Sequence, residues 1–352
     1  MTVDDIIRRY EGRKFSACEA MFFRNFCRCL RNYAPHSKLE HMSKILEGVF
    51  DDKMNVLKED INVTDKASPV LITVVKDELT RMREFFRHYR RIGVRKFVIL
   101  DNASQDGTRE FCMSQNDTDV FSIERPFTSA RHVSWINKLL LRYGFDRWYI
   151  SVDADELLDF PSSENFGVDD LVQAAKDLGL FRVAAVTVDF YPDADLFAFP
   201  NDCIRWEDTC WFDTDSYEMR KSGRCWRMVG GPRKRVLGTY SVLSKYPLFY
   251  LRPQDIFLSV HYLWPFSENF ASKWFLVLKH YEFLNKEDRR KITAIIERAN
   301  YASNSREYKE MLETMSRHSA LSFWHTGSVK YSTSADLMKL PFMSSIFEEA
   351  KS

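Results

Sequence analysis

The sequence predicts an α/β fold in which a mostly parallel sheet is flanked by helices. From residue 69 onward, short β-branched or apolar runs alternate with segments of helical spacing. Turn residues such as Asp106 and Gly107 separate these runs. Strands that alternate with helices are joined as parallel neighbours by right-handed crossovers, which places helices on both faces of the sheet.

Residues 1–68 precede the alternating part and are predicted to form an N-terminal helical extension. The stretch DDIIRRYEGRKFSACEAMFFRNFCRCLRNY carries apolar residues at helical spacing with arginines between them. Up to Arg31 it contains seven basic and four acidic side chains. We expect these helices to pack on the main domain, and the alternative is a helix that binds a membrane surface or a partner.

Residues 69–265 form the predicted main domain, which opens with four strands and three helices in alternation. The first strand is β-branched, and the following helix has apolar residues every three or four positions. The predicted strands are PVLITVV (69–75), KFVILDN (96–102), DVFSIERPF (119–127) and WYISVDADE (148–156), and the helices are ELTRMREFFRHYRRIG (78–93), TREFCMS (108–114) and SARHVSWINKLLLRYG (129–144).

Residues 266–352 are predicted to be helical again. The stretch SENFASKWFLVLKHYEFLNKEDRRKITAIIERA begins with a serine that suits a helix cap, and its apolar residues follow helical spacing. We expect these helices to buttress the main domain, and a lid over the site or a dimer contact are the alternatives.

Composition excludes several classes of function. The 51 basic and 50 acidic residues nearly cancel, so no global field draws the chain to nucleic acid. Only 12 glycines are present, and none forms a glycine-rich phosphate loop. The seven cysteines show no zinc spacing and are expected to be reduced.

Because no leader or membrane span is visible, the sequence predicts a cytoplasmic protein, with peripheral contact at the inner face of a membrane as an option.

Acidic side chains follow three of the four predicted strands. Ligands of open parallel sheets bind beyond the carboxyl ends of the strands, so these side chains are expected to line one crevice. They are Asp77 and Glu78 after the first strand, Asp101 with Asn102 after the second, and Asp153, Asp155 and Glu156 after the fourth.

The run DADE is the densest of these acidic groups. Asp153 and Asp155 either point to one face of a continuing strand or converge if the chain turns there. Convergent carboxylates repel one another unless a cation lies between them. Oxygen ligands favour Mn²⁺ or Mg²⁺, whose open coordination positions are commonly taken by nucleotide phosphates.

Several motifs in order resemble the family 2-type glycosyltransferases of the GT-A fold, in particular a bacterial branch whose first strand ends in a K-[DN]-E triplet. The motifs are VVKDELTRMREFFRHYRRIGVRKFVILDNASQDGT, WYISVDADELLDFP, GGPRKRV, SVHYLW and LSFWHTGSVKYSTSADL. The similarity covers roughly residues 70–335 and implies a Rossmann-like GT-A domain with a nucleotide-sugar site, most simply for a UDP-sugar.

The resemblance also implies roles for individual residues. Asp77 and Glu78 would lie beside the base or ribose of the nucleotide. Asp101 would accept hydrogen bonds from the uracil or ribose, and Asn102 would lie next to it in the same site. The remaining assignments are Asp153 and Asp155 as ligands of Mn²⁺ or Mg²⁺ against the diphosphate, and His261 as the late histidine that completes the metal site.

A basic cluster follows the turn Gly-Gly-Pro in GGPRKRV. Arginine forks suit phosphate oxygens, so Arg233 and Arg235 are predicted to bind the diphosphate, and a basic surface strand is the alternative. An inverting transfer also needs a base for the acceptor hydroxyl, and Asp189 and Asp213 are the two candidates.

The predicted function is therefore metal-dependent transfer of a sugar to a glycan or glycoconjugate acceptor, in the assembly of a bacterial surface polysaccharide. The alternative from another class is an inactive sugar-binding, nucleotide-binding or scaffold protein of the same fold. A nucleotidyltransferase would use similar carboxylates, but it is expected to carry a glycine-rich phosphate loop, and VVKDELTR has none.

Overall fold

The computed structural model describes most of residues 1–352. The described part leaves out residues 34, 61–65, 67, 197–205, 223–224, 270–272, 283–287, 289–312, 315, 318–320 and 352. The helical segment predicted for residues 283–299 falls largely outside the described residues.

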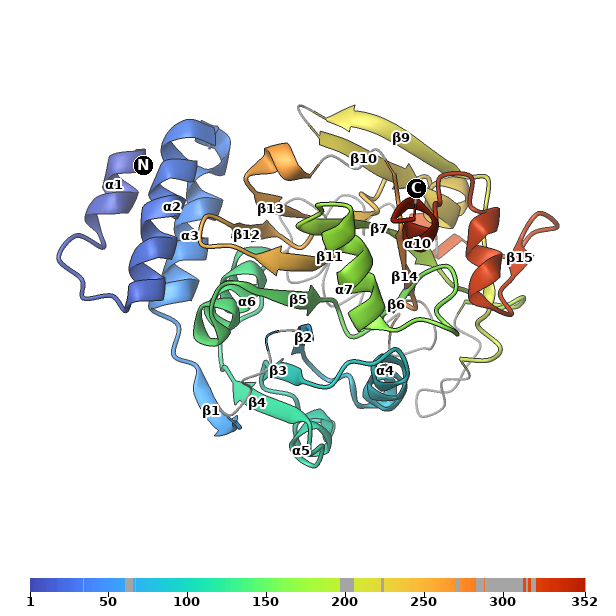
Figure 1. Ribbon diagram of the computed structural model, residues 1–352, viewed down its shortest axis with the longest axis horizontal. Coiled ribbons are helices and arrows are strands. Elements are labelled where there is room, and N and C mark those ends of the chain that lie inside the picture. Colours follow the sequence, from blue (N-terminus) through green and yellow to red (C-terminus); the bar gives the residue numbers. More distant parts are fainter. Residues whose placement is uncertain are drawn as a thin grey trace.

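A nine-stranded sheet forms the centre of the molecule (Figure 1). Within the described residues, six of its strands share one direction, namely β2, β3, β4, β5, β7 and β14, while β1, β6 and β11 oppose them. The order across the sheet is β1-β4-β3-β2-β5-β11-β7-β14-β6. The strands are β1 (Asn55–Lys58), β2 (Val70–Val75), β3 (Phe97–Asp101), β4 (Thr118–Ser122), β5 (Arg147–Ser151), β6 (Glu156–Asp159), β7 (Arg182–Asp189), β11 (Ser244–Leu251) and β14 (Leu276–His280).

Helices flank this sheet, and in the described part of the chain three small strand pairs lie outside it. The helices are α1 (Val3–Arg8), α2 (Ala17–Tyr33), η1 (His36–Lys38), α3 (Leu39–Phe50), α4 (Leu79–Arg91), α5 (Thr108–Met113), α6 (Ser129–Tyr143), α7 (Val168–Asp177), η2 (Arg233–Leu237), η3 (Phe266–Glu268), η4 (Ser334–Lys339) and α10 (Ile346–Glu349). The pairs join β8 (Trp211–Phe212) to β15 (Val329–Lys330), β9 (Tyr217–Ser222) to β10 (Cys225–Gly230), and β12 (Ile256–Ser259) to β13 (Tyr262–Trp264).

The first half of the main domain confirms the predicted α/β class. β2, β3, β4 and β5 are parallel neighbours, joined through α4, α5 and α6. The chain moves outward from β2 to β4 and then returns past β2 to β5, so right-handed crossovers place α4 and α5 on one face and α6 on the other. As predicted, the carboxyl ends of these four strands share one edge of the sheet.

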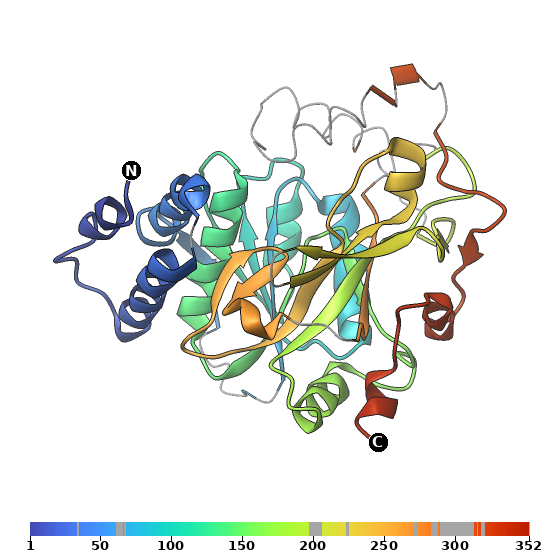
Figure 2. The same cartoon turned by 90° about the horizontal axis from the view of Figure 1, so that it is seen from above.

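The N-terminal segment is helical over most of its length, as predicted, and it packs against α6 at one end of the molecule (Figures 1 and 2). The Trp135 indole N–H donates to Asp52 Oδ2 at 2.9 Å, and Lys138 Nζ donates to the carbonyl of Val49 at 2.8 Å. One part of the prediction is wrong, because residues 55–58 form the edge strand β1, which pairs with β4.

The prediction of helix is also wrong for Leu276–His280. These residues form β14, which lies between β7 and β6 inside the sheet. An apolar run of this length fits a buried strand and a helix equally well from spacing alone, and the partner strands decide between them. The predicted boundary at residue 265 therefore leaves one strand of the central sheet outside the main domain.

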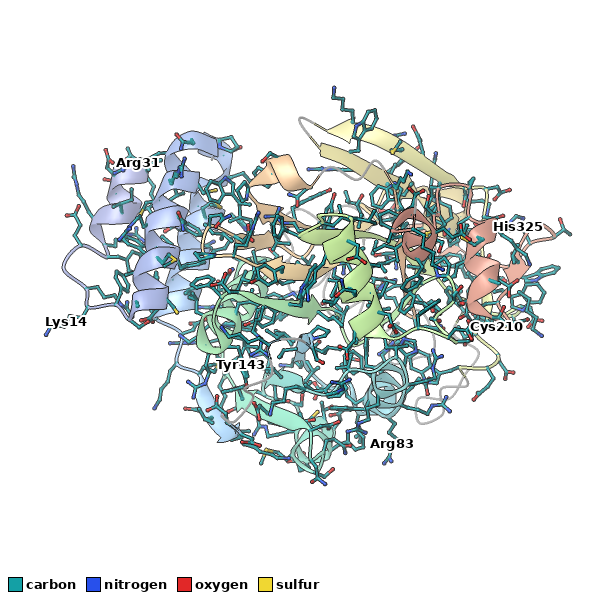
Figure 3. The ribbon with its side chains drawn as sticks, in the orientation of Figure 1. Lys14, Arg31, Arg83, Tyr143, Cys210 and His325 are labelled. Atoms are coloured by element: carbon teal, nitrogen blue, oxygen red, sulfur yellow. The ribbon has the colours of Figure 1, made fainter. Side chains whose placement is uncertain are left out.

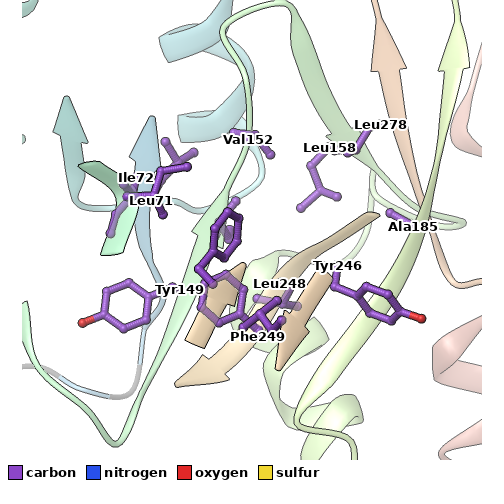
Figure 4. Packing of buried hydrophobic residues seen from close by; sticks show 14 of the residues in the cluster. Leu71, Ile72, Tyr149, Val152, Leu158, Ala185, Tyr246, Leu248, Phe249 and Leu278 are labelled. Carbon is purple, nitrogen blue, oxygen red and sulfur yellow. The ribbon is translucent and has the colours of Figure 1, made fainter. Parts of the chain in front are cut away.

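The core lies on the strands near the middle of the sheet, as Figure 4 shows. Leu71 and Ile72 of β2, Tyr149 of β5, Leu248 of β11 and Leu278 of β14 have no accessible surface. Each buried side chain of this size stabilises the fold by about 1.5–3 kcal/mol. The strands that carry the acidic side chains are thus held rigidly by the core.

His88 of α4 lies in this interior in its neutral form. Its Nε2–H donates to the carbonyl of Leu158 at 2.7 Å, and burial together with the charge of Lys279 lowers its pKa to about 3. The native state therefore resists protonation of His88 between about pH 6.5 and 3, whereas the unfolded chain takes up the proton, so stability falls as the pH is lowered through this window.

We expect the free energy of unfolding of the wild type to fall by about 2 kcal/mol more than that of His88→Gln between pH 7 and pH 5. Glutamine does not titrate, so the difference between the two slopes isolates His88 from the other acid-sensitive groups. Urea unfolding at both pH values measures it. Equal losses for the two proteins would contradict the neutral buried state of His88.

Among the described residues, no helix has both the length and the apolar character needed to cross a bilayer.

Candidate active site

The acidic run after β5 lies in a tight turn between β5 and β6. Asp153 and Asp155 belong to this turn, and Glu156 begins β6. The backbone N–H of Asp153 donates to Glu156 Oε2 at 3.1 Å, which closes the turn. The chain therefore turns at DADE, so the carboxylates are gathered in one place.

Lys245 of β11 contacts two of these carboxylates. Its ammonium lies 2.8 Å from Asp153 Oδ2 and 2.6 Å from Glu156 Oε1. Burial opposes the charge of Asp153, but Lys245 and His132 outweigh it and lower the pKa of Asp153. Burial dominates at Glu156 and raises its pKa even though Lys245 opposes the shift.

His280, the last residue of β14, joins Asp155 to Asp189. Its Nε2 lies 3.4 Å from Asp155 Oδ2, and its Nδ1 lies 2.9 Å from Asp189 Oδ1. Burial opposes protonation of the ring, but Asp155 and Asp189 raise the pKa of His280 to about 10. The ring therefore lies between Asp155 and Asp189, with Arg233 Nη2 2.7 Å from its Nδ1, and holds the ends of β5, β7 and β14 together.

Arg233 completes the environment of Asp189. The guanidinium donates to both oxygens of this carboxylate, at 2.7 and 2.9 Å, and also lies 2.7 Å from Glu282 Oε2. Burial opposes ionisation of Asp189, yet Arg233 and His280 hold the pKa of Asp189 at about 2. A carboxylate with so low a pKa is a weak proton acceptor.

The basic cluster GGPRKRV forms a helical turn instead of a strand. Gly230 and Gly231 have positive φ angles of 116° and 70°, and a Cβ on Gly230 would lie 2.2 Å from the Ser216 carbonyl oxygen, so this tight approach requires glycine. The following turn, η2, points Arg233 at Asp189 and Arg235 at Asp213. Both arginines predicted to bind phosphate thus have carboxylate partners within the chain.

Asp213, the second candidate base, is fully buried. Arg235 donates to both of its oxygens at 3.0 Å, and the hydroxyl groups of Tyr191 and Ser216 also donate to it. His325 Nε2 lies 3.4 Å from Asp213, on the side of the molecule opposite the N-terminal helices (Figure 3). Asp213, Asp215 and His325 place ligand atoms within 4.8 Å of one another, but Arg235 already neutralises Asp213.

The predicted metal ligands Asp153, Asp155 and His261 do not form such a group in the described part of the chain. The carboxylates contact Lys245 and His280, and these two cations repel a metal ion. His261 Nδ1 lies 3.0 Å from the carbonyl of Ser244, and burial lowers the pKa of the ring to about 4. The neutral ring therefore keeps a lone pair on Nε2, but as a set the three residues do not fit a metal ion here.

The ends of β2 and β3 carry the other predicted residues. Asp77 has a positive φ of 54°, and its Oδ1 accepts from the backbone of Gln105 at 2.7 Å. Glu78 pairs with Arg81 at 2.8 Å. Asp101 pairs with Arg109 at 2.7 Å. These acids therefore order the loops beyond the strands and are each partnered inside the chain.

A pocket of about 550 Å³ opens beside Asn102, and it is lined by Lys76, Asn102, Ala103, Ser104, Gln105, Arg109, Glu124, Arg125 and Pro126. The Asn102 amide N–H groups donate to the carbonyls of Ile123 and Arg125 at 3.1 and 2.9 Å. Its Oδ1 is buried and has no hydrogen-bond partner among the described residues. A buried, unsatisfied acceptor at a pocket is suited to an N–H donor of a ligand.

Two residues of the site, Lys245 and His280, were missed from sequence. Each interrupts or ends an apolar run, in LSKYPLFYL and in WFLVLKHY. A charged or titratable residue inside a strand-like run is rarely buried without a partner, and that was the available signal. The carboxylate partners of Lys245 lie at least 89 positions away in the sequence, and Asp189 lies 91 positions from His280. Spacing alone therefore did not identify these pairs.

Comparison with known proteins gives a partial similarity. The chain is 26% identical over 100 residues to a glycosyltransferase family 92 protein of Oryza sativa subsp. japonica. The chain is similar to a glycosyltransferase over part of its length. The aligned part covers 28% of this chain and 17% of that relative, so the match spans a small share of both proteins.

Two further comparisons add no family assignment. No protein-family model matches the chain. A crystal structure of S. aureus TarS 1–349 aligns at 12% identity over 72% of each chain with a TM-score of 0.29, which is too low to establish a shared fold.

Proposed function

We propose that the protein is a glycosyltransferase of the GT-A type that moves a sugar from a nucleoside diphosphate donor to a glycan or glycoconjugate acceptor. The observation that carries the proposal is the shared edge of the sheet, where Asp101 ends β3, Asn102 follows it, and the DADE turn follows β5. Ligands of open α/β sheets bind at this edge. The partial similarity to a glycosyltransferase supports the same reaction class.

The pocket beside Asn102 is the proposed site of the nucleoside. The unpaired Oδ1 of Asn102 is the proposed acceptor for a ring N–H of the base. Uracil has this donor at N3 and guanine at N1, and the sequence resemblance makes UDP the proposed nucleotide. Lys76, Arg109 and Arg125 line the pocket and give it cationic groups beside a diphosphate. The DADE turn would then lie near the sugar and its phosphate.

The proposed reaction inverts the anomeric carbon. The acceptor oxygen forms a bond to that carbon, the bond to the diphosphate oxygen breaks with its electron pair leaving on the diphosphate, and a base takes the acceptor proton. Asp189 and Asp213 are the proposed bases, and each of these carboxylates is paired with an arginine, Arg233 or Arg235. No step of this reaction is assigned to the predicted Mn²⁺ or Mg²⁺, because Lys245 and His280 already lie against Asp153 and Asp155.

Isothermal titration of UDP and of GDP into the full chain tests the donor site. We expect UDP to bind more tightly than GDP, and Asn102→Leu to weaken UDP binding by about 10-fold, the usual cost of one lost hydrogen bond at a buried acceptor. Asn116→Leu, at a position outside the pocket, is the control. If neither nucleotide binds to the folded protein, the transferase proposal fails and the scaffold alternative takes its place.

The biological setting is proposed from the sequence resemblance. A family 2-type enzyme of the bacterial branch would act in the assembly of a surface polysaccharide, in the cytoplasm and in contact with the inner face of the membrane. Transfer of a radiolabelled sugar from its nucleotide to lipid-linked or polymeric acceptors of a cell extract tests this assignment.

A further inference from the structure

Lys245 reaches the acidic edge of the sheet because β11 runs against its neighbours. β11 lies between β5 and β7 and is antiparallel to both. Its first residues, Ser244 and Lys245, therefore lie at the edge where β5 ends, and Lys245 is opposite Ala185 of β7. One reversed strand thus places a lysine among carboxylates that follow the parallel strands.

The ammonium of Lys245 occupies the position between two carboxylates. It lies 2.8 Å from Asp153 and 2.6 Å from Glu156, and these are charge-assisted hydrogen bonds. The Lys245 side chain is 10% exposed and that of Glu156 only 1%, whereas that of Asp153 is 36% exposed. The bridge is therefore buried on the Glu156 side and open to a ligand on the Asp153 side.

The third carboxylate of the turn has a cation of its own, because His280 lies 3.4 Å from Asp155. All three acidic side chains of DADE are thus compensated by cationic groups of this chain. A divalent ion bound to Asp153 would have to displace or approach the ammonium of Lys245, and like charges at such distances repel strongly.

An ammonium group has three N–H donors, and within the described residues two of those of Lys245 bind carboxylates. We propose that Lys245 is the resident cation of the donor site, bridging Asp153 and Glu156 and giving its remaining N–H to a phosphate oxygen of the nucleoside diphosphate, so that the donor binds without a divalent metal. This inference rests on the proposed function and adds to it the identity of the charge that holds the diphosphate.

Titration of UDP into the full chain in EDTA and again in MnCl₂ is the first test. We expect the wild type to bind UDP in EDTA with a Kd within about threefold of the Kd in Mn²⁺, a difference of less than about 1 kcal/mol in binding free energy. If UDP binds only in Mn²⁺, the transferase proposal stands and the role of Lys245 is overturned. If UDP binds under neither condition, both fall.

Substitution of the lysine is the second test. Lys245→Met is expected to weaken UDP binding in EDTA by about 10- to 100-fold, the range for a lost hydrogen bond to a charged group. Lys245→Met alone leaves the buried carboxylate of Glu156 without its cation and can therefore destabilise the fold. The double variant Lys245→Met with Glu156→Gln removes both charges of the buried pair and avoids this cost. An affinity equal to that of the wild type in either folded variant would overturn the proposal.

Lys279→Met is the matched control. Lys279 is also a buried lysine, on the neighbouring part of the sheet, and its ammonium lies 2.7 Å from Asp159. Its loss is expected to lower stability but to leave the Kd for UDP within about twofold, because the pair lies outside the proposed donor site. A loss of UDP affinity in Lys279→Met as large as in Lys245→Met would show a general effect of removing a buried lysine and would also overturn the proposal.

Discussion

Replacement of Asp155 by asparagine is expected to reduce sugar transfer by about 100-fold or more, the usual cost of removing one preorganised charged group from an active site. Asparagine keeps the shape of the side chain but removes the charge that faces His280 Nε2 at 3.4 Å. The rate of nucleoside diphosphate release from a UDP-sugar in the presence of acceptor measures the effect. Asp177→Asn, which removes one charge at the end of α7, is expected to leave the rate unchanged.

The same substitution has a second readout that does not depend on catalysis. Asp155 is a main cause of the raised pKa of His280, which is about 10, so Asp155→Asn is expected to move this pKa down toward the usual value of about 6.5. A pH titration of the imidazole nitrogens by NMR would detect the shift. An unchanged pKa of His280 would contradict the contact with Asp155, and an unchanged transfer rate would contradict the place of Asp155 in the site.

The parts of the fold that the sequence predicted are those fixed by local patterns. The alternation from β2 to β5 is visible because each strand is followed within a few residues by its own helix, and the crossover rule then sets the direction. β14 was missed because the run FLVLKH fits both periods, and its strand character comes from pairing with β7 and β6, more than 80 residues away.

The residues of the candidate site also divide into those that local sequence patterns predicted and those that only the fold brings together. Asp153 and Asp155 were predicted together, since they are neighbours in one turn of the chain. The cations that face them come from β11 and β14, and no spacing rule connects those strands to DADE. For the same reason Arg233 and Arg235 were predicted to bind phosphate, whereas in the fold each faces a carboxylate that a distant strand or loop supplies.

Arg182 supports the hairpin that carries His261, and its loss is expected to cost about 3–5 kcal/mol of unfolding free energy, because it removes four hydrogen bonds of a buried charged group, each of about 1 kcal/mol. The guanidinium of this β7 residue lies 2.9 Å from Asp255 and donates to the carbonyls of Leu263 and Pro265 at 3.1 and 2.9 Å. Both side chains of the ion pair are almost completely buried. Arg182→Met would remove the donor to the Pro265 carbonyl and one of the donors to Asp255 and to the Leu263 carbonyl, which keep Arg252 and Asn269. Urea unfolding at pH 7 measures the loss.

Arg252→Met is the matched comparison, because Arg252 binds the same carboxylate, at 2.9 Å, and is more exposed, with 14% of its side chain accessible. Arg252→Met removes contacts to Asp255 while Arg182 remains, so its cost is expected to be about 1–2 kcal/mol, as for one ordinary hydrogen bond to a charged group. Arg182→Lys should fall between the two variants, since one ammonium does not reproduce the fork of a guanidinium. Equal costs for Arg182→Met and Arg252→Met would mean that the carbonyls on the β12–β13 hairpin gain little from Arg182, and that another contact positions His261.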